Sequence, residues 1–252
     1  EGGWTRHEPD AAALVARLAP ARARILRTRA LLVEWVPRPP YVDAPAVRWI
    51  TEPPDATRTD QRWFTDGSLI DAKWDALTVA AAALVVVSDD GELLAAAEVR
   101  LPPAVRTAPA AGANAVALAV AFSVSVPRIV TDCKSLLDTV RAGAARATAA
   151  SSPLAGIWNR IAAHCGDDLA PLTDGHLLWM PAHTTAASFA ARCKSDGTPV
   201  TRLEWRANRL ADAIAKRTAM GCAAPRTAVR ALGCAARAVF TEAAELGAVT
   251  HA

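Results

Sequence analysis

The order of apolar segments predicts an α/β protein built on a mixed sheet, and three observations support this. Two apolar runs, 78–88 and 92–101, flank Asp89-Asp90-Gly91, and an Asp-Gly turn between apolar runs indicates a β-hairpin. Beyond the hairpin, apolar segments of helical length alternate with short apolar strands, which is typical of a sheet covered by helices. The chain has 252 residues, enough for one sizeable domain with appendages.

The N-terminal region has a different pattern. Between Ala11 and Trp35, apolar residues recur at helical spacing and are interrupted near Pro20, which predicts two amphipathic helices. The stretch 36–60 is rich in proline and is expected to be an irregular linker. We therefore expect three parts: a helical segment with its linker (1–58), the sheet domain (59–222) and a C-terminal amphipathic helix (223–252).

Within the sheet domain, the first strand is expected at 62–65, ending at Asp66 before a Gly67-Ser68 turn. The hairpin supplies the second and third strands. The expected elements that follow are an alanine-rich helix (108–124), a strand (128–131), a helix (133–141), a loop (142–152), a helix (153–165), a fifth strand (176–180) and a closing helix (205–221).

Composition excludes several classes of protein. Although 52% of residues are hydrophobic, no uninterrupted apolar stretch is long enough to span a membrane. The first 15 residues are polar and charged, unlike a signal peptide, and a start at Glu1 suggests a piece of a longer product. The five cysteines are scattered without CxxC spacing, so we expect free thiols in an intracellular, reducing compartment, either nucleus or cytoplasm.

The net charge is +3, and residues 206–252 hold seven basic and three acidic side chains. This excess suits a phosphate-contacting surface, although a solvated basic helix face explains it equally well.

Isolated polar residues stand out against the apolar elements. Asp66 and Asp132 follow predicted strands, His183 follows the fifth strand, and Asp212 lies on the closing helix. Each has an ordinary alternative: Asp66 in a turn, Asp132 as a helix N-cap, His183 as a cap or surface residue, and Asp212 as an exposed helix residue.

These residues stand in four motifs, in this order: Thr65-Asp66-Gly67-Ser68, Thr131-Asp132-Cys133-Lys134, Trp179-Met180-Pro181-Ala182-His183-Thr184 and Asn208-Arg209-Leu210-Ala211-Asp212. Together the four motifs resemble those of the type 1 ribonuclease H family, as found in retroelements. The resemblance covers about residues 60–222. It implies an α/β, RNase H-like fold: a five-stranded mixed sheet with strands 1–3 antiparallel and helices on both faces, here with extra helices at both termini.

The resemblance also implies an activity: cleavage of the RNA strand of an RNA–DNA hybrid with two Mg²⁺ or Mn²⁺ ions. Carboxylates are the ligands that such hard cations prefer, and a metal pair activates water and neutralises charge at the phosphate. By this resemblance, Asp66 bridges both ions, Asp132 holds the nucleophile-side ion, Asp212 completes the site, and His183 assists product release or proton transfer.

The sequence departs from the family at its second carboxylate, a Glu on the first helix. In the matching stretch Ala113-Asn114-Ala115-Val116-Ala117-Leu118, Asn114 stands at that position, and residues 101–131 contain no Asp or Glu. An amide is a weaker, uncharged ligand, so we expect a poorly occupied second metal position and reduced activity.

Substrate contacts are expected from Gly67, Ser68, Arg202, Arg206 and Arg209, with Trp205 in the core. The basic, Trp-bearing protrusion of some family members is missing, because 142–152 has one arginine and no aromatic residue. Nucleic acid, most simply an RNA–DNA hybrid, is therefore the expected partner, with no membrane association. The alternatives are a non-catalytic nucleic-acid-binding module descended from a retroelement, and a nuclease or integrase-type enzyme acting on DNA.

Overall fold

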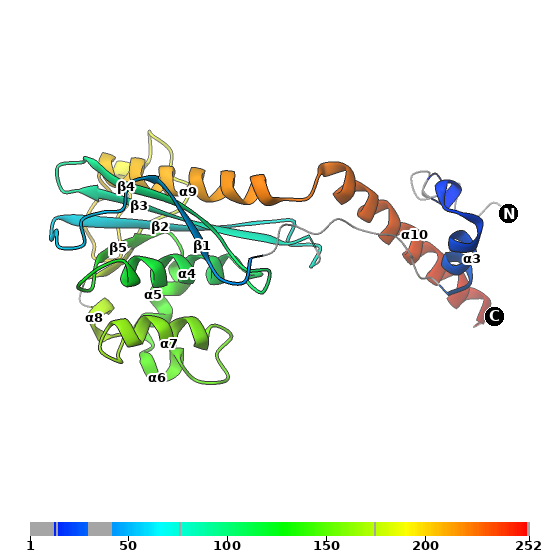
Figure 1. The fold of residues 1–252 in the computed structure, drawn as a ribbon, viewed down its shortest axis with the longest axis horizontal. Helices are drawn as coiled ribbons and strands as arrows, with labels where there is room; N and C mark the ends of the chain where they lie inside the picture. The colour runs from blue at the N-terminus through cyan, green and yellow to red at the C-terminus, as the bar shows by residue number, and fades with distance from the viewer. Residues whose placement is uncertain (1–12, 14, 30–41, 76, 174, 251–252) are drawn as a thin grey trace. The chain divides into compact units, whose positions relative to one another are not determined.

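The computed structural model describes residues 13, 15–29, 42–75, 77–173 and 175–250 (Figure 1). Parts of two expected elements lie outside these residues. For the expected N-terminal helices these are residues 11–12, 14 and 30–35. For the expected linker they are residues 36–41.

Six strands form one mixed sheet in the order β1-β4-β3-β2-β5-β6. The first four strands in this order, β1, β4, β3 and β2, pair antiparallel with their neighbours. β5 pairs parallel with β2, and β6 pairs parallel with β5. The strands from β2 onward make up the predicted five-stranded mixed sheet with its first three strands antiparallel, and this α/β fold is confirmed with one strand more. The bounds are β1 (Ala46–Thr51), β2 (Gln61–Ile70), β3 (Val79–Ser88), β4 (Leu93–Arg100), β5 (Arg128–Thr131) and β6 (Leu177–Trp179).

The additional strand, β1, lies in the stretch expected to be an irregular linker, so that prediction is wrong for residues 46–51. Val47 and Trp49 pack against the same hydrophobic core as Phe122. The Trp49 and Phe122 rings meet edge-on, with 5.2 Å between their centroids. On the other face Arg48 pairs with Glu98 of β4 at 2.6 Å. The alternation of apolar and polar residues that marks a strand is short here: it consists of Val47, Arg48 and Trp49, in a segment flanked by prolines.

The turn expected at Gly67-Ser68 is also wrong, because β2 continues to Ile70. Asp66, Gly67 and Ser68 pair with Ala83, Ala82 and Ala81 of β3. Glycine is required here by packing, since a Cβ atom on Gly67 would clash with the backbone of α4.

Helices cover both faces of the sheet (Figure 1). One face packs on α4, and the smaller helices α5 to α8 lie on the same side; α9 packs on the other face, with Phe189 beside it. α4 starts at the side-chain cap of Thr107, which accepts from Ala110 N at 3.2 Å. The bounds are α4 (Ala108–Ala121), α5 (Lys134–Arg141), α6 (Ala144–Ala147), α7 (Ala155–His164), α8 (Ala170–Thr173), the 3₁₀ turn η1 (Phe189–Ala191) and α9 (Arg202–Cys222).

The two faces divide the alternating residues of β3 between two cores. Leu84 and Val86 face the α4 side, whereas Ala83, Val85 and Val87 face α9. All ten residues of β3 are buried, which explains its continuous apolar sequence.

A second compact unit is formed by the two ends of the chain, 1–39 and 224–252, while 40–223 form the sheet unit. α3 (Pro20–Arg29) and α10 (Arg226–Thr250) pack through Leu26 and Ala238. The boundaries expected near 58 and 222 remain predictions as domain limits. Among the described residues no helix is both long and apolar enough to cross a bilayer, and the five cysteines are free.

Candidate metal-binding and catalytic site

Asp66 of β2 and Asp132, which directly follows β5, lie at the same level of the sheet on neighbouring strands. The parallel ladder between β2 and β5 ends at the pair Thr65–Thr131, and each aspartate is the next residue. Adjacent strands lie about 4.8 Å apart, so the register itself brings the two carboxylates close together. Asp132 does not cap α5: the N-cap position is Cys133, whose backbone N–H donates to Thr131 Oγ1 at 3.2 Å.

Asp212 reaches the same region from α9. The N-terminus of this helix is held by a capping box in which Thr201 and Glu204 exchange hydrogen bonds. The buried Glu204 carboxylate also pairs with Lys194 and with Arg62 of β2, which ties the helix to the sheet. The face of α9 that packs on the sheet carries small residues spaced four apart, which allow the helix to approach closely: Ala207, Ala211 and Ala215.

The three carboxylates interact electrostatically. Burial, followed by the negative charges of Asp132 and Asp212, raises the pKa of Asp66 to about 7. Burial also raises the pKa of Asp132, with Asp212 adding to the effect, while a hydrogen bond from Asn208 and the nearby His183 act in the opposite direction. Asp212 is neutralised in part by Lys216, one turn along α9, at 2.7 Å. Without a cation, the site therefore concentrates unfavourable negative charge.

His183 lies at the mouth of this site. Together with Asp132 and Asp212 it lines a cavity of about 230 Å³. The histidine is exposed and has φ = 53°, a left-handed conformation that is uncommon outside glycine.

The segment that carries His183 is anchored to α9. The Trp205 indole donates to Thr184 O at 3.0 Å, and its ring stacks on Phe189 at 5.3 Å. Trp205 thus supports the His183 segment and contributes to the wall of the cavity, in addition to packing on the core.

Asn208 is the site residue that the sequence reasoning did not identify. Its side-chain amide donates to Asp132 Oδ2 at 3.3 Å, and the residue is 6% exposed. Its buried Oδ1 has no hydrogen-bond partner among the described residues. A signal was available, because Asn208 precedes Asp212 by four residues and therefore shares its helix face.

Asn114 is not brought to the three aspartates. It is buried in α4, where its Nδ2 donates to Ala110 O at 2.9 Å and its Oδ1 accepts from Arg160 of α7 at 3.0 Å. Gly112, about 200° away around the helix, faces Leu136 and Cys133, the residue next to Asp132. Asn114 therefore joins two helices, and the expectation that it stands at the fourth ligand position is corrected.

The donor set suits a hard divalent cation in its chemistry. Asp66, Asp132 and Asp212 supply oxygen ligands, and a cation would offset both the burial of the Asp66 charge and its repulsion by the other two carboxylates, which together raise the pKa of Asp66. Within the described ranges, however, no three His, Cys, Asp or Glu side chains are already close enough to hold a metal together. The three carboxylates therefore fit a cation by their charge and donor type, and not by a preformed ligand geometry.

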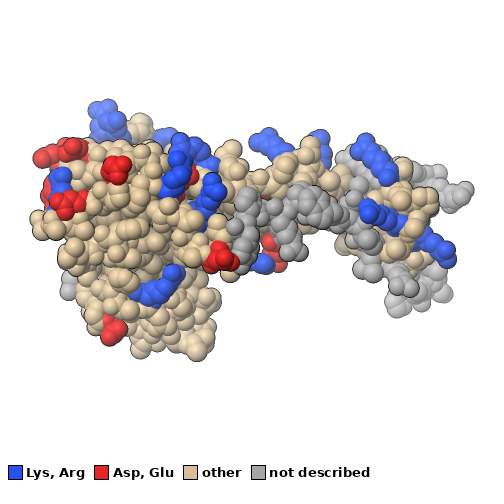
Figure 2. Space-filling view, viewed as in Figure 1, with Lys and Arg blue, Asp and Glu red and all other residues tan. Residues whose placement is uncertain are grey.

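The residues expected to contact substrate are divided by the structure. Gly67 packs against α4, while Arg209 lines the carboxylate cavity and stacks over Trp205 at 5.3 Å. Arg202 and Arg206 line a separate hollow, described below, to which Arg209 also contributes. On the face of the sheet unit shown in Figure 2, basic and acidic side chains are interspersed with wide uncharged areas, so this face carries no continuous basic surface.

Comparison with known proteins gave few matches. No family model and no curated protein matches the sequence. Among solved structures, the crystal structure of prototype foamy virus protease-reverse transcriptase is 16% identical with a TM-score of 0.42, covering 66% of this chain and 21% of that chain. The solution structure of the PFV RNase H domain is 16% identical with a TM-score of 0.41, covering 64% of this chain and 94% of that one.

Proposed function

We propose that this chain is a metal-dependent endonuclease of the ribonuclease H type, acting on the RNA strand of RNA–DNA hybrids with reduced activity. The observation that supports it is the meeting of Asp66, Asp132 and Asp212 in one partly buried site, where burial, together with the negative charges of the other two carboxylates, raises the pKa of Asp66 to about 7. Such a cluster is costly unless a cation binds to it, which is why strongly perturbed carboxylates mark candidate functional sites.

In this proposal the three aspartates hold Mg²⁺ or Mn²⁺. The bound cation would lower the pKa of an attacking water and offset charge on the phosphate. Asn208 fixes the orientation of Asp132 by its hydrogen bond, and Trp205 holds the segment carrying His183. His183, which is exposed and lines the cavity, would assist product release or proton transfer in this proposal.

Reduced activity is proposed because a fourth carboxylate is lacking. α4 contains no acidic residue, and its position next to Cys133 is Gly112. Losing one charge about 4 Å from a divalent ion weakens binding by several kcal/mol at an effective dielectric of about 20. We therefore expect one metal position to be filled more readily than the second.

A second candidate is a nucleic-acid-binding module that has kept the fold without catalysis. The observation favouring it is that, in the part of the chain that the structure describes, no three potential ligands are pre-arranged for a metal. An origin in a reverse-transcribing element and an intracellular location belong to this proposal and to the first alike.

The deciding experiment is cleavage of an end-labelled RNA–DNA hybrid in Mg²⁺ and in Mn²⁺. Asp66→Asn is the blank, and Asp138→Asn, an exposed aspartate of α5, is the matched control. Slow, metal-dependent cleavage by the unaltered chain and by Asp138→Asn, lost in Asp66→Asn, supports the enzyme. Cleavage at the blank's rate, with hybrid binding retained, supports the module, and cleavage of duplex DNA instead would indicate a DNA nuclease.

Calorimetric titration with Mn²⁺ gives an independent result. Two sites favour the two-metal enzyme, whereas one weak site favours the module. Asp66→Asn should abolish the heat of Mn²⁺ binding in either case, because Asp66 is a proposed ligand both in the two-metal enzyme and in the module with one weak site.

A further inference from the structure

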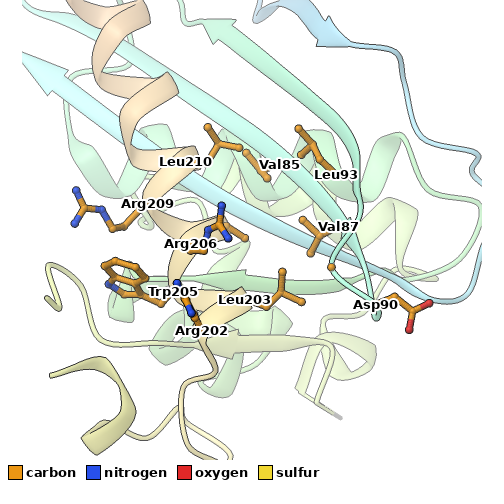
Figure 3. A pocket seen from close by; sticks show the side chains of 12 residues that line it. Val85, Val87, Asp90, Leu93, Arg202, Leu203, Trp205, Arg206, Arg209 and Leu210 are labelled. Atoms are coloured by element: carbon orange, nitrogen blue, oxygen red, sulfur yellow. The ribbon is translucent and has the colours of Figure 1, made fainter. Parts of the chain in front are cut away.

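A second and larger hollow, of about 800 Å³, lies between α9 and the β3–β4 hairpin. Figure 3 shows Leu203, Arg206 and Leu210 of α9 turned toward Val85, Val87 and Leu93 of the hairpin. Trp205 and Arg209 line both hollows, and in Figure 3 their side chains turn to the other side of the helix from Leu203 and Leu210. We call the hollow on the hairpin side the α9–hairpin groove.

The floor of the α9–hairpin groove is aliphatic and open to solvent. Leu93 is 43% exposed and Leu210 is 38% exposed, although both flank residues of the core. Covering a leucine side chain contributes on the order of 1 kcal/mol or more. A ligand that fills the groove must therefore bring large apolar groups of its own.

The rim of the groove is positively charged. Arg202 and Arg206 are exposed, lie one helical turn apart, and have no ion pair among the residues the structure describes. The acidic residue between them in sequence, Glu204, is buried and already paired with Lys194 and Arg62, so it does not neutralise them. Asp90 is the one acidic residue lining the groove within the described residues.

We propose that the α9–hairpin groove binds a short, acidic, amphipathic segment of a partner protein. Its leucine-like side chains would cover Leu93 and Leu210, and its carboxylates would pair with Arg202 and Arg206. The lining from 202 to 210 extends about 12 Å along α9, the length of about two helical turns or four extended residues. This interaction goes beyond the proposed nuclease function and does not depend on it.

A nucleic acid strand fits the groove less well. Bases bind single-strand grooves by stacking on aromatic rings. Trp205 is the aromatic residue of this lining, and its ring is already stacked on Phe189 and points away from the groove. The aliphatic floor favours protein side chains.

The test is fluorescence anisotropy with the full chain and a labelled peptide that places leucine pairs between Asp and Glu residues. Three comparison probes are the same peptide with Lys for its acidic residues, the same peptide with Ser for its leucines, and a single-stranded oligonucleotide of equal charge. We expect the acidic leucine peptide to bind about tenfold more tightly than each comparison probe.

Variants locate the binding. Arg206→Glu should weaken it about tenfold and Leu93→Ser about fivefold. The matched controls are Arg141→Glu, an exposed arginine of α5, and Met220→Ser, an apolar α9 residue that is 63% exposed and outside the groove; both should bind as the unaltered chain does. Circular dichroism confirms that each variant is folded.

Tighter binding of the oligonucleotide, equal binding of all peptides, or equal loss in Met220→Ser and Leu93→Ser would overturn the proposal. Hybrid cleavage by Leu93→Ser should match that of the unaltered chain, since Leu93 does not line the carboxylate cavity. A chain without nuclease activity that still binds the peptide leaves this proposal intact, so the two failures are distinguishable.

Discussion

Gly67 of β2 lies against the backbone of α4 so closely that a Cβ atom on it would stand 2.7 Å from Ala111 Cβ, and closer still to the Gly112 nitrogen. This approach sets the distance between α4 and the strand that carries Asp66. The glycine next to the central aspartate is therefore a packing requirement.

Gly67→Ala should lower the free energy of unfolding by about 2–3 kcal/mol, because backbone atoms, which cannot move aside cheaply, occupy the space of the new methyl group. The control is Gly156→Ala in α7, where a Cβ meets nothing within 4 Å; there, better helix propensity should raise stability by up to about 1 kcal/mol. Urea unfolding followed by circular dichroism measures both. Equal effects at the two glycines would contradict the packing role.

The raised pKa of Asp66 predicts how stability depends on pH without metal. Its ordinary value of 3.8 applies to the unfolded chain and about 7 to the folded one. Between these values the folded state holds the Asp66 proton more tightly, so the contribution of Asp66 to the free energy of unfolding falls as pH rises from about 4 to about 7 and is level above that.

Asp66→Asn removes this dependence and should stabilise the protein at pH 8, in chelator, by about 2–4 kcal/mol, with little change at pH 4. Unfolding by urea at the two pH values measures the difference. Asp138→Asn, in an exposed position, is expected to change neither value. If Asp66→Asn were equally stabilising at both pH values, the cost of ionising the buried Asp66 carboxyl beside the other two would not be the cause.

Metal affinity should depend on the same proton. Below pH 7 a cation must displace it, so the apparent affinity for Mn²⁺ should fall up to about tenfold for each pH unit below 7 and level off above it. Calorimetry in buffers of different ionisation enthalpy should show about one proton released at pH 6 and almost none at pH 8. A flat pH profile would indicate that the cation does not bind through Asp66.

Asn114→Ala tests the structural role of the buried amide. Loss of its hydrogen bonds to Ala110 O and Arg160 should cost about 1 kcal/mol of stability, after the gain in helix propensity. Asn159→Ala, an exposed asparagine of α7, should be neutral or slightly stabilising. If Asn114→Ala left stability unchanged but abolished Mn²⁺ binding, Asn114 would be a ligand after all.

Local patterns predicted much of the architecture. The hairpin follows from Asp89-Asp90-Gly91, with Gly91 at φ = 92°, and the core run of β3 from its unbroken apolar residues. β1 is not predicted, because an alternating segment of six residues between prolines is too short to distinguish from a loop. The continuation of β2 was missed because Gly67-Ser68 is locally indistinguishable from a turn.

By itself the sequence determined the fold class and the order of Asp66, Asp132, His183 and Asp212, because hydrophobic period and turn chemistry are properties of neighbouring residues. Only the tertiary structure decided what each helix face meets. It turned Asn114 toward Arg160, brought Asn208 to Asp132, and separated Arg206 from Arg209 on two sides of α9. The period of 3.6 residues shows which side chains share a face, but the packing of helix on sheet decides what lies opposite them.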